Sequence, residues 1–150
     1  MIRELNRNDT SAILKHAPNF WAEIKGDNLL GKLSLAGFSN FLNNGFAKDS
    51  IIGWCYCKDA EILSGLLFQK EYAFFTDENI LAEVFWWASP TIRSTTISYR
   101  LIKCAEQYAA QNDIDKIRMS CMLFPQPERL TRFYTKIGYH PIQQDFVKKI

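Results

Sequence analysis

The segment from Ile80 to Tyr108 constrains the fold more than any other part of this chain. An almost wholly apolar run ends at Pro90, a short turn rich in hydroxyl groups follows, and a run with helical periodicity completes the segment. A strand that leads through a turn into a helix start leaves backbone N–H groups unpaired at the positive end of the helix dipole. The segment therefore predicts a binding site for a phosphate-bearing ligand at the start of this helix.

The apolar run is expected to form a central strand of the sheet. Strict alternation places two largely apolar sets of residues on opposite faces: Ile80, Ala82, Val84, Trp86 and Ala88 on one, and Leu81, Glu83, Phe85 and Trp87 on the other. The helical pattern after it stops at Asn112. A right-handed crossover through this helix would place a strand at residues 117–123 parallel to the apolar strand.

The rest of the chain shows further extended and helical patterns. Strands are expected at residues 2–5, 51–57, 62–68 and 142–150, and the second and third of these would form an antiparallel hairpin. Three more helices are expected: one that carries Ile13 and stops before Pro18, one over about 33–42 that ends at Asn43-Asn44-Gly45, and one that opens at Pro127 and closes at Gly138.

Composition and charge narrow the classes of function. A chain of 150 residues with 47% hydrophobic content fits one domain over residues 1–150. The net charge of +2 is too small to argue for a nucleic acid or an anionic membrane as partner. The four cysteines have no zinc spacing, so we expect reduced, buried thiols and no metal. Since no apolar run reaches the ~18 residues of a membrane span, a soluble, cytoplasmic protein is expected.

Two motifs, together with the order of the elements, resemble the GNAT superfamily of acetyl-coenzyme A-dependent N-acyltransferases. After their fourth strand, members carry a Pro and an R-x-x-G-x-G/A loop that leads into a long helix. The matching string here is Pro90-Thr91-Ile92-Arg93-Ser94-Thr95-Thr96-Ile97-Ser98. The proline and the arginine stand at the spacing of the family motif, but other residues occupy the positions of its glycines. The closer match is Glu128 to Tyr139, which is similar to a late helix ending in L-Y-x-K-x-G-F. The Trp86-Trp87 pair is also similar to phage-encoded members.

The resemblance implies an α/β fold with a mixed, mostly antiparallel central sheet of six to seven strands, about four flanking helices and a parallel, splayed pair in the middle. It implies transfer of an acetyl group from acetyl-CoA, as co-substrate, to a primary amine within a ternary complex. On this mapping the pantetheine arm pairs with backbone groups of Trp87, Ala88 and Ser89. The pyrophosphate is held by backbone N–H groups of Arg93, Ser94, Thr95, Thr96, Ile97 and Ser98, with a charge-assisted contact from the Arg93 side chain.

Tyr134 and Glu83 are the candidate catalytic residues. The family match to Tyr134 protonates the departing thiolate, which a phenol with a pKa near 10 can do at neutral pH. Glu83 is the only charged residue between Ile80 and Ala88. A carboxylate in such a strand is costly to bury unless it is paired, solvated or shifted upward in pKa, and an upward shift suits a general base. Packing of the Tyr134 ring in the core and a salt bridge from Glu83 to a helix are the competing interpretations.

The loop residues leave three functions open. Side chains at Thr96 and Ser98 occupy space that family glycines leave free, although small hydroxyls can themselves donate to phosphate. The first hypothesis is an active acetyltransferase whose amine acceptor is unidentified. The second is a catalytically silent protein of the same fold, such as a virion or assembly component. The third, ranked last, is a nucleic-acid-directed member. A homodimer is compatible with each, and a phage-encoded member would act in the host cytoplasm.

Overall fold

A five-stranded sheet forms the centre of the molecule. The computed structural model describes residues 1–93 and 95–150. The strands follow one another in chain order across the sheet, and all neighbours are antiparallel except the last pair, which is parallel. Their bounds are β1 (Ile2–Glu4), β2 (Ile51–Lys58), β3 (Glu61–Ala73), β4 (Glu78–Ala88) and β5 (Lys116–Arg118). The predicted hairpin, the central position of β4 and the parallel β4–β5 pair are confirmed.

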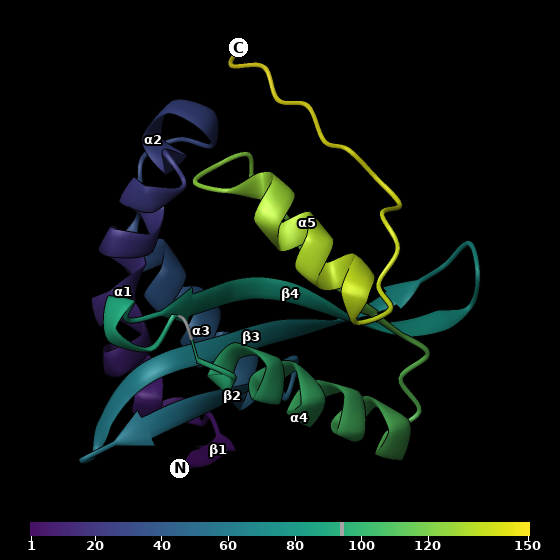
Figure 1. Cartoon of the computed structure of the whole chain (residues 1–150), viewed down its shortest axis with the longest axis horizontal. Helices are drawn as coiled ribbons and strands as arrows, with labels where there is room; N and C mark the ends of the chain where they lie inside the picture. The colour runs from purple at the N-terminus through teal and green to yellow at the C-terminus, as the bar shows by residue number, and fades with distance from the viewer. Residues whose placement is uncertain (94) are drawn as a thin grey trace.

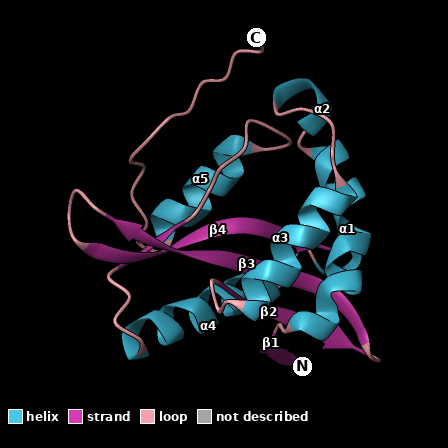
Figure 2. Ribbon diagram, turned by 180° about the vertical axis from the view of Figure 1, so that it is seen from behind, coloured by secondary structure: helices cyan, strands magenta, loops and turns pink. Residues whose placement is uncertain are grey.

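Helices cover both faces of this sheet. The four longer ones are α1 (Thr10–Glu23), α3 (Leu35–Ala47), α4 (Ile97–Gln111) and α5 (Pro127–Lys136), and the short elements are η1 (Arg7–Asp9), α2 (Gly26–Leu29) and η2 (Pro90–Ile92). Figure 1 shows α4 and α5 in front of the sheet, and Figure 2 shows α1 and α3 on the opposite face. No helix in the described residues is both long enough and apolar enough to cross a bilayer.

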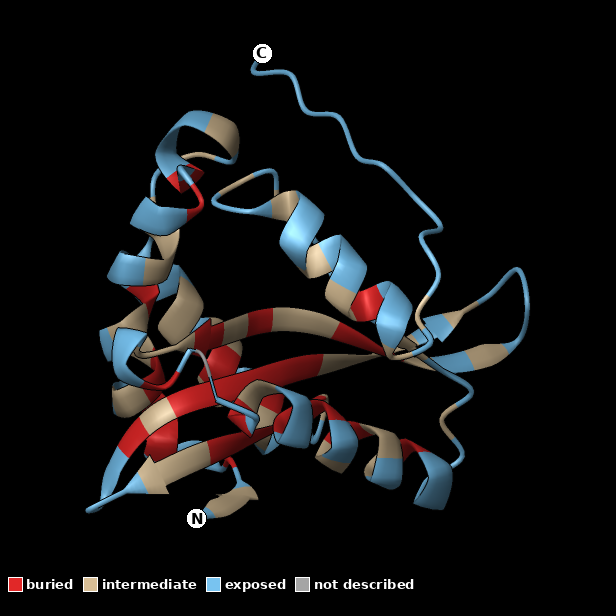
Figure 3. Ribbon diagram, viewed as in Figure 1, coloured by how far each residue is buried: buried red, intermediate tan, exposed pale blue. Residues whose placement is uncertain are grey.

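Each face of the sheet contributes to its own hydrophobic core. On the α4/α5 side, the fully buried side chains of Leu66, Phe68 and Leu81 pack with Leu101 of α4. On the α1/α3 side, the corresponding cluster is formed by Ile13, Leu42, Cys55, Leu67, Phe85 and Trp87. Figure 3 shows this burial along β2, β3 and β4, while the hairpin tip and the C-terminal segment are exposed. β4 contributes to both cores, as expected for a central strand.

Two helices end later than their sequences predict. Pro18 lies inside α1, which continues to Glu23, and the later residue Phe20 packs edge-to-face on Phe85. This tertiary contact outweighs the local cost of a proline in a helix. Helix α3 likewise runs through Gly45, where a Cβ atom would lie 2.8 Å from the Ile51 side chain. The glycine is therefore explained by close packing against β2 and not by a helix stop.

The C-terminal half departs from prediction at its strands. The last helix opens at Pro127 and its C′ glycine, Gly138, has a φ of +96°, both as predicted. Strand β5 is only three residues long, whereas residues 117–123 were expected to be extended. Residues 142–150 form no strand. The sheet consequently has five strands in place of the predicted six to seven.

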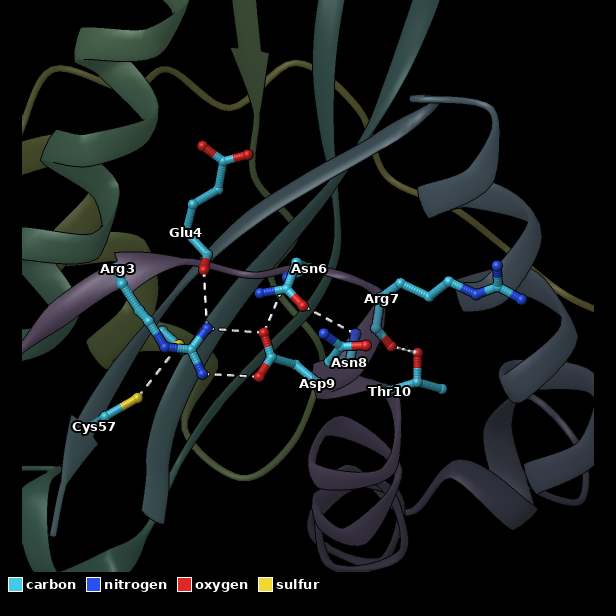
Figure 4. Close-up of polar contacts among 9 residues, drawn as sticks. Arg3, Glu4, Asn6, Arg7, Asn8, Asp9, Thr10 and Cys57 are labelled. Atoms are coloured by element: carbon cyan, nitrogen blue, oxygen red, sulfur yellow. Dashed lines mark hydrogen bonds and ion pairs between the residues drawn. The ribbon is translucent and has the colours of Figure 1, made fainter. Parts of the chain in front are cut away.

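An ion pair fastens the N-terminal strand to the first helices (Figure 4). The Arg3 guanidinium donates two bonds of 2.8 Å to the two carboxylate oxygens of Asp9, which also accepts a 2.9 Å bond from the backbone N–H of Asn6. The Asp9 carboxylate is buried, and the hydrogen bonds from Arg3 hold its pKa below the usual value. This arrangement fixes β1 against the start of α1.

Replacing Asp9 with Ala should lower the free energy of unfolding at neutral pH by about 2 kcal/mol, because Arg3 would lose its partner. Since the pKa of Asp9 is lower in the folded state, its contribution is present above about pH 4 and is lost as the pH falls through the folded pKa. Urea unfolding of both proteins at neutral and acidic pH measures this difference. Asp145→Ala, at an exposed position, is the control; equal loss in both variants would contradict the assignment.

Candidate active site between β4 and β5

A bulge interrupts β4 near its middle. In the pairing with β3, Leu67 lies opposite Phe85, but the next residue of β3, Phe68, lies opposite Glu83. Val84 therefore has no partner across the strands. An extra residue in one strand bends it and reverses the alternation of side chains beyond that point.

The reversal changes which residues face the α4/α5 side. Leu81, before the bulge, packs in the α4/α5 core, and so do Trp86 and Ala88 after it. Phe85 and Trp87 pack in the α1/α3 core. The face assignment predicted from strict alternation is therefore wrong beyond the bulge, because it placed Trp86 and Ala88 opposite Leu81.

Strands β4 and β5 separate immediately before the bulge. Their parallel pairing runs from Ile80–Lys116 to Ala82–Arg118 and includes no later residues. Just beyond it, the backbone N–H of Ser120 donates a 2.7 Å hydrogen bond to Oε2 of Glu83. The candidate base thus lies where the two strands diverge, and the competing interpretation of a salt bridge to a helix is not what the structure shows.

The same serine contacts the second candidate. The Tyr134 hydroxyl, on α5, donates a 2.9 Å hydrogen bond to the backbone C=O of Ser120. One residue therefore binds Glu83 through its N–H group and Tyr134 through its carbonyl. The structure brings together the two side chains predicted to be catalytic, which are 51 positions apart in the sequence.

Burial makes Glu83 a stronger base than an ordinary carboxylate. Desolvation raises its pKa to about 7, while the hydrogen bond from Ser120 acts in the opposite direction. A carboxylate with such a pKa is ionised in a large fraction of molecules at neutral pH and can hold a proton there. This balance suits a group that accepts a proton from an amine.

Tyr134 is buried and remains protonated. Desolvation, followed by the charge of Glu83, raises its pKa above the ordinary value for a phenol. Its ring packs on Trp86 at 6.0 Å between centroids and on Tyr139 at 5.9 Å. The two proposals for this residue, core aromatic and proton donor, are therefore compatible, since packing fixes the ring while the hydroxyl lies at the opening between the strands.

The loop between β4 and α4 is held by its own side chains. Arg93 donates from Nε to the backbone C=O of Ala88 at 2.9 Å and forms a 2.6 Å ion pair with Glu23 of α1. The predicted role of Arg93 at a pyrophosphate remains a prediction, because the structure shows two of its donors bound within the protein. Ser94, another predicted contact, lies outside the described residues.

The start of α4 retains backbone donors. Thr95 Oγ1 donates to the C=O of Ile92 at 2.6 Å and accepts from the N–H of Ile97 at 3.3 Å, so this hydroxyl and this amide are both engaged. The first helical bond runs from the N–H of Arg100 to the C=O of Thr96, which leaves the N–H groups of the intervening first turn, including that of Ser98, without helical acceptors.

The hydroxyl-bearing residues that the structure describes at the start of α4 are exposed or half-buried. Thr95 and Thr96 are exposed and Ser98 is half-buried. The surface over the helix start is therefore open to a ligand, and its free amides fit an anion. The predicted contacts of Thr96, Ile97 and Ser98 with a pyrophosphate remain predictions. At Ile97 a ligand would have to compete with the Thr95 hydroxyl for the backbone N–H.

Two of the three residues predicted to pair with a pantetheine arm need correction. The N–H of Ser89 donates to the C=O of Leu63, and the C=O of Trp87 accepts from the buried hydroxyl of Ser64 at 2.7 Å. Trp87 and Ser89 therefore bond to β3, and the C=O of Ala88 is bound by Arg93. The prediction is therefore not supported for Trp87 and Ser89, whose backbone groups face β3. The backbone of Ala88 does face the open edge, where its C=O accepts from Arg93 and its N–H remains a predicted contact.

Antiparallel pairing identifies a residue that the sequence did not. Backbone groups alternate between the two edges of a strand, so when Trp87 and Ser89 point toward β3, Trp86 directs its N–H and C=O to the opposite, open edge. Ser120 was also missed as a site residue. Neither has a local sequence signal, since each depends on the register of strands that are distant in the chain.

The metal-ligating side chains of the described residues do not cluster in groups of three or more. Within residues 1–93 and 95–150, no three His, Cys, Asp or Glu side chains gather closely enough to hold a metal ion. The four cysteines are free, but Cys121 is exposed, which corrects the prediction that the thiols are buried.

Comparison with known proteins identifies the architecture. No family model and no curated protein sequence matches this chain. Among solved structures, a predicted acetyltransferase from Clostridium acetobutylicum, solved with acetyl-CoA, superposes with a TM-score of 0.81 at 13% identity, covering 99% of this chain and 95% of that one. A GCN5-related N-acetyltransferase from Ralstonia eutropha gives a TM-score of 0.76 at 19% identity, covering 100% and 97%.

A third neighbour extends the range of related activities. An aminoglycoside acetyltransferase from an uncultured soil metagenomic sample has a TM-score of 0.75 at 16% identity, covering 100% of this chain and 97% of that one. These identities are low, but the superpositions cover 99% or more of this chain. The chain therefore has the fold of the GNAT acetyltransferases.

Proposed function

We propose that this protein is an N-acyltransferase that moves an acetyl group from acetyl-CoA to a primary amine by direct transfer. The observation that carries the proposal is the contact of Ser120 with both Glu83 and Tyr134 at the opening between β4 and β5. It places one proton acceptor and one proton donor on the two backbone groups of a single residue. The fold shared with acetyltransferases, one of them solved with acetyl-CoA, supports the same chemistry.

Each side chain has a defined part in the proposed reaction. Glu83 accepts a proton from the ammonium group, so that the neutral amine can attack the thioester carbonyl carbon. A C–N bond forms, the C–S bond breaks, and the sulfur leaves with its electron pair. Tyr134 rotates its O–H from the carbonyl of Ser120 toward the sulfur and protonates it. The second proton of the amine passes to solvent, solvent reprotonates the phenolate of Tyr134, and Glu83 releases the proton that it took, so both side chains return to their starting states.

Acetyl-CoA would be held by the backbone of this chain. The N–H and C=O of Trp86 at the open edge of β4 suit the amide groups of the pantetheine arm. The free N–H groups in the first turn of α4 suit the pyrophosphate, with the helix dipole adding to the attraction. Arg93 can add a charge-assisted bond with donors that Glu23 and Ala88 leave free.

Calorimetric titration with acetyl-CoA tests the proposal directly. We expect saturable binding with a dissociation constant in the micromolar to millimolar range that is usual for enzyme substrates. Arg93→Ala should weaken binding about 10-fold through the loss of one charge-assisted hydrogen bond. Arg7→Ala is the matched control: Arg7 is an exposed arginine near the N-terminus, so this variant should bind acetyl-CoA as the wild type does. Absence of binding at millimolar ligand would favour a catalytically silent protein with this fold.

A further inference from the structure

Two of the four cysteines lie next to one another on β2. Cys55 and Cys57 are separated by one residue, so their side chains project from the same face of the strand. Their Sγ atoms are 3.6 Å apart and share a weak S–H···S hydrogen bond. Neither thiol takes part in the proposed acetyl transfer. The distance between the sulfurs brings them within reach of a reaction with one another.

The two thiols differ in their access to solvent. Cys55 is fully buried in the α1/α3 core. Cys57 is half-buried and lines a surface cavity of about 580 Å³ together with Met1, Tyr56 and Lys58. Burial, followed by the hydrogen bond with Cys57, raises the pKa of Cys55 to about 12, so this group stays a protonated thiol. A small oxidant therefore reaches Cys57 first, while Cys55 remains available as the second thiol.

A positive charge lies beside the pair. Arg3 of β1 is directly opposite Cys55 across the two strands, so its side chain lies on the same face as both sulfurs. Figure 4 shows the guanidinium group of Arg3 beside Cys57. The hydrogen bonds to Asp9 raise the pKa of Arg3, and the nearby sulfurs act in the same direction. A cation next to thiols favours the thiolate form, which is the form that peroxides oxidise.

The backbone allows the two sulfurs to be joined, but under strain. Two residues along a strand span roughly 6.6 Å between Cα atoms, and disulfides occur up to about 6.8 Å. The extra residue in the pairing of β2 with β3 is Leu63 of β3, so β2 itself is regular at the two cysteines. A bond between Cys55 and Cys57 must therefore shorten β2 locally. Strained disulfides are the ones that thiols reduce easily, so such a bond would be reversible.

We propose that Cys55 and Cys57 form a peroxide-sensitive dithiol that converts reversibly into an intramolecular disulfide. The Cys57 thiolate attacks the terminal oxygen of a hydroperoxide, the O–O bond breaks, and the leaving oxygen departs as an alcohol or water after protonation. The product is a sulfenic acid on Cys57. The Cys55 sulfur then attacks the Cys57 sulfur. An S–S bond forms, the S–O bond breaks, and the hydroxyl leaves as water with the proton of the Cys55 thiol. The hydroperoxide takes up two electrons, and a thiol reductant returns them.

Oxidation should weaken the fold around β1. Met1 exchanges two backbone hydrogen bonds of 2.8 Å with Cys57, and Arg3 pairs with Cys55, so a shortened β2 would strain the pairing of both strands. A ring closed over so few residues gives little entropic stabilisation in return. We therefore expect the oxidised protein to unfold at a lower urea concentration than the reduced protein. Dithiothreitol should restore the original midpoint.

Peptide mapping of the full chain after treatment with hydrogen peroxide tests the proposal. Trypsin cleaves after Lys48 and Lys58, so both cysteines lie in one peptide of residues 49–58. We expect this peptide to lose two hydrogen atoms and to resist alkylation, and dithiothreitol should reverse both changes. This measurement uses the wild-type protein and needs no variant to fold. A peptide that remains fully alkylatable, or that carries only a sulfinic acid on Cys57, would overturn the proposal, as would a bond between two molecules.

Single substitutions assign the two roles. Cys55→Ala keeps the accessible thiol and removes its partner, so a sulfenic acid should accumulate on Cys57 and be trapped by a 1,3-dione. Cys57→Ala leaves only the buried thiol, and its peptide should resist peroxide. Cys104→Ala, at a half-buried cysteine of α4, is the matched control and should form the bond as the wild type does. Equal trapping in Cys55→Ala and the wild type would contradict the role of Cys55. None of these readouts depends on acetyl-CoA, so they are independent of the proposed activity.

Discussion

Glu83→Gln is expected to lower kcat/KM for an amine acceptor about 100-fold at neutral pH, the lower end of what a general base contributes. The amide keeps an oxygen that accepts from the N–H of Ser120, so the local structure should be retained. In the wild type, kcat/KM should rise with pH through about 7, because the raised pKa of Glu83 sets the point at which the base becomes ionised. That limb should be absent from the variant, whereas the limb due to the acceptor amine remains.

The same substitution gives a second, independent measurement. Because the pKa of Glu83 is higher in the folded than in the unfolded state, its ionisation destabilises the fold as the pH rises from about 4.5 to 7. Glu83→Gln should therefore be more stable than the wild type at about pH 8 and similar at about pH 4. Glu128→Gln, an exposed acidic residue in the first turn of α5, is the control. An unchanged pH profile in Glu83→Gln would remove this residue from the mechanism.

Tyr134→Phe is expected to reduce kcat by about 100-fold or more with a smaller effect on KM, since the phenol acts when the sulfur departs. Thioester release should be followed by trapping the free thiol, and the binding of acetyl-CoA should be followed calorimetrically. The lost hydrogen bond to Ser120 should lower stability by only about 1 kcal/mol, because the aromatic packing is retained.

Two outcomes separate catalysis from packing at this position. Tyr139→Phe removes a neighbouring phenol from the same aromatic cluster and should leave turnover near the wild-type value. If both variants lose the same activity, the effect arises from the core and not from proton donation. If Tyr134→Phe retains full turnover while Glu83→Gln does not, another group or water supplies the proton.

The parts of the fold that were predictable from sequence are those with local signals. Helix α4 shows helical periodicity from Ile97 and stops at Asn112, and α5 has Pro127 and Gly138 at its two ends. These signals arise within a few residues of one another, so no tertiary information is needed to interpret them. The β2–β3 hairpin is recognisable for the same reason.

The parts that failed depend on contacts between distant segments. Pro18 was expected to end a helix, but α1 continues beyond it because packing of Phe20 on Phe85 of β4 stabilises the later turn. The bulge at Val84 arises from the pairing of β4 with β3. No motif within the β4 sequence predicts the extra residue. The sequence alone named Glu83 and Tyr134 as candidates, and the structure places both on Ser120, but it directed the backbone groups of Trp87 and Ser89 to the wrong edge of the strand.

The candidate acid and base are spaced by backbone groups of one residue. The N–H of Ser120 binds Glu83 and its C=O binds Tyr134, and these two groups belong to successive peptide units on either side of one Cα atom. Neither backbone bond depends on which side chain stands at position 120, because every residue except proline supplies both an N–H and a C=O. We therefore expect position 120 to accept many residue types without loss of either bond, and only proline to detach Glu83 from the main chain.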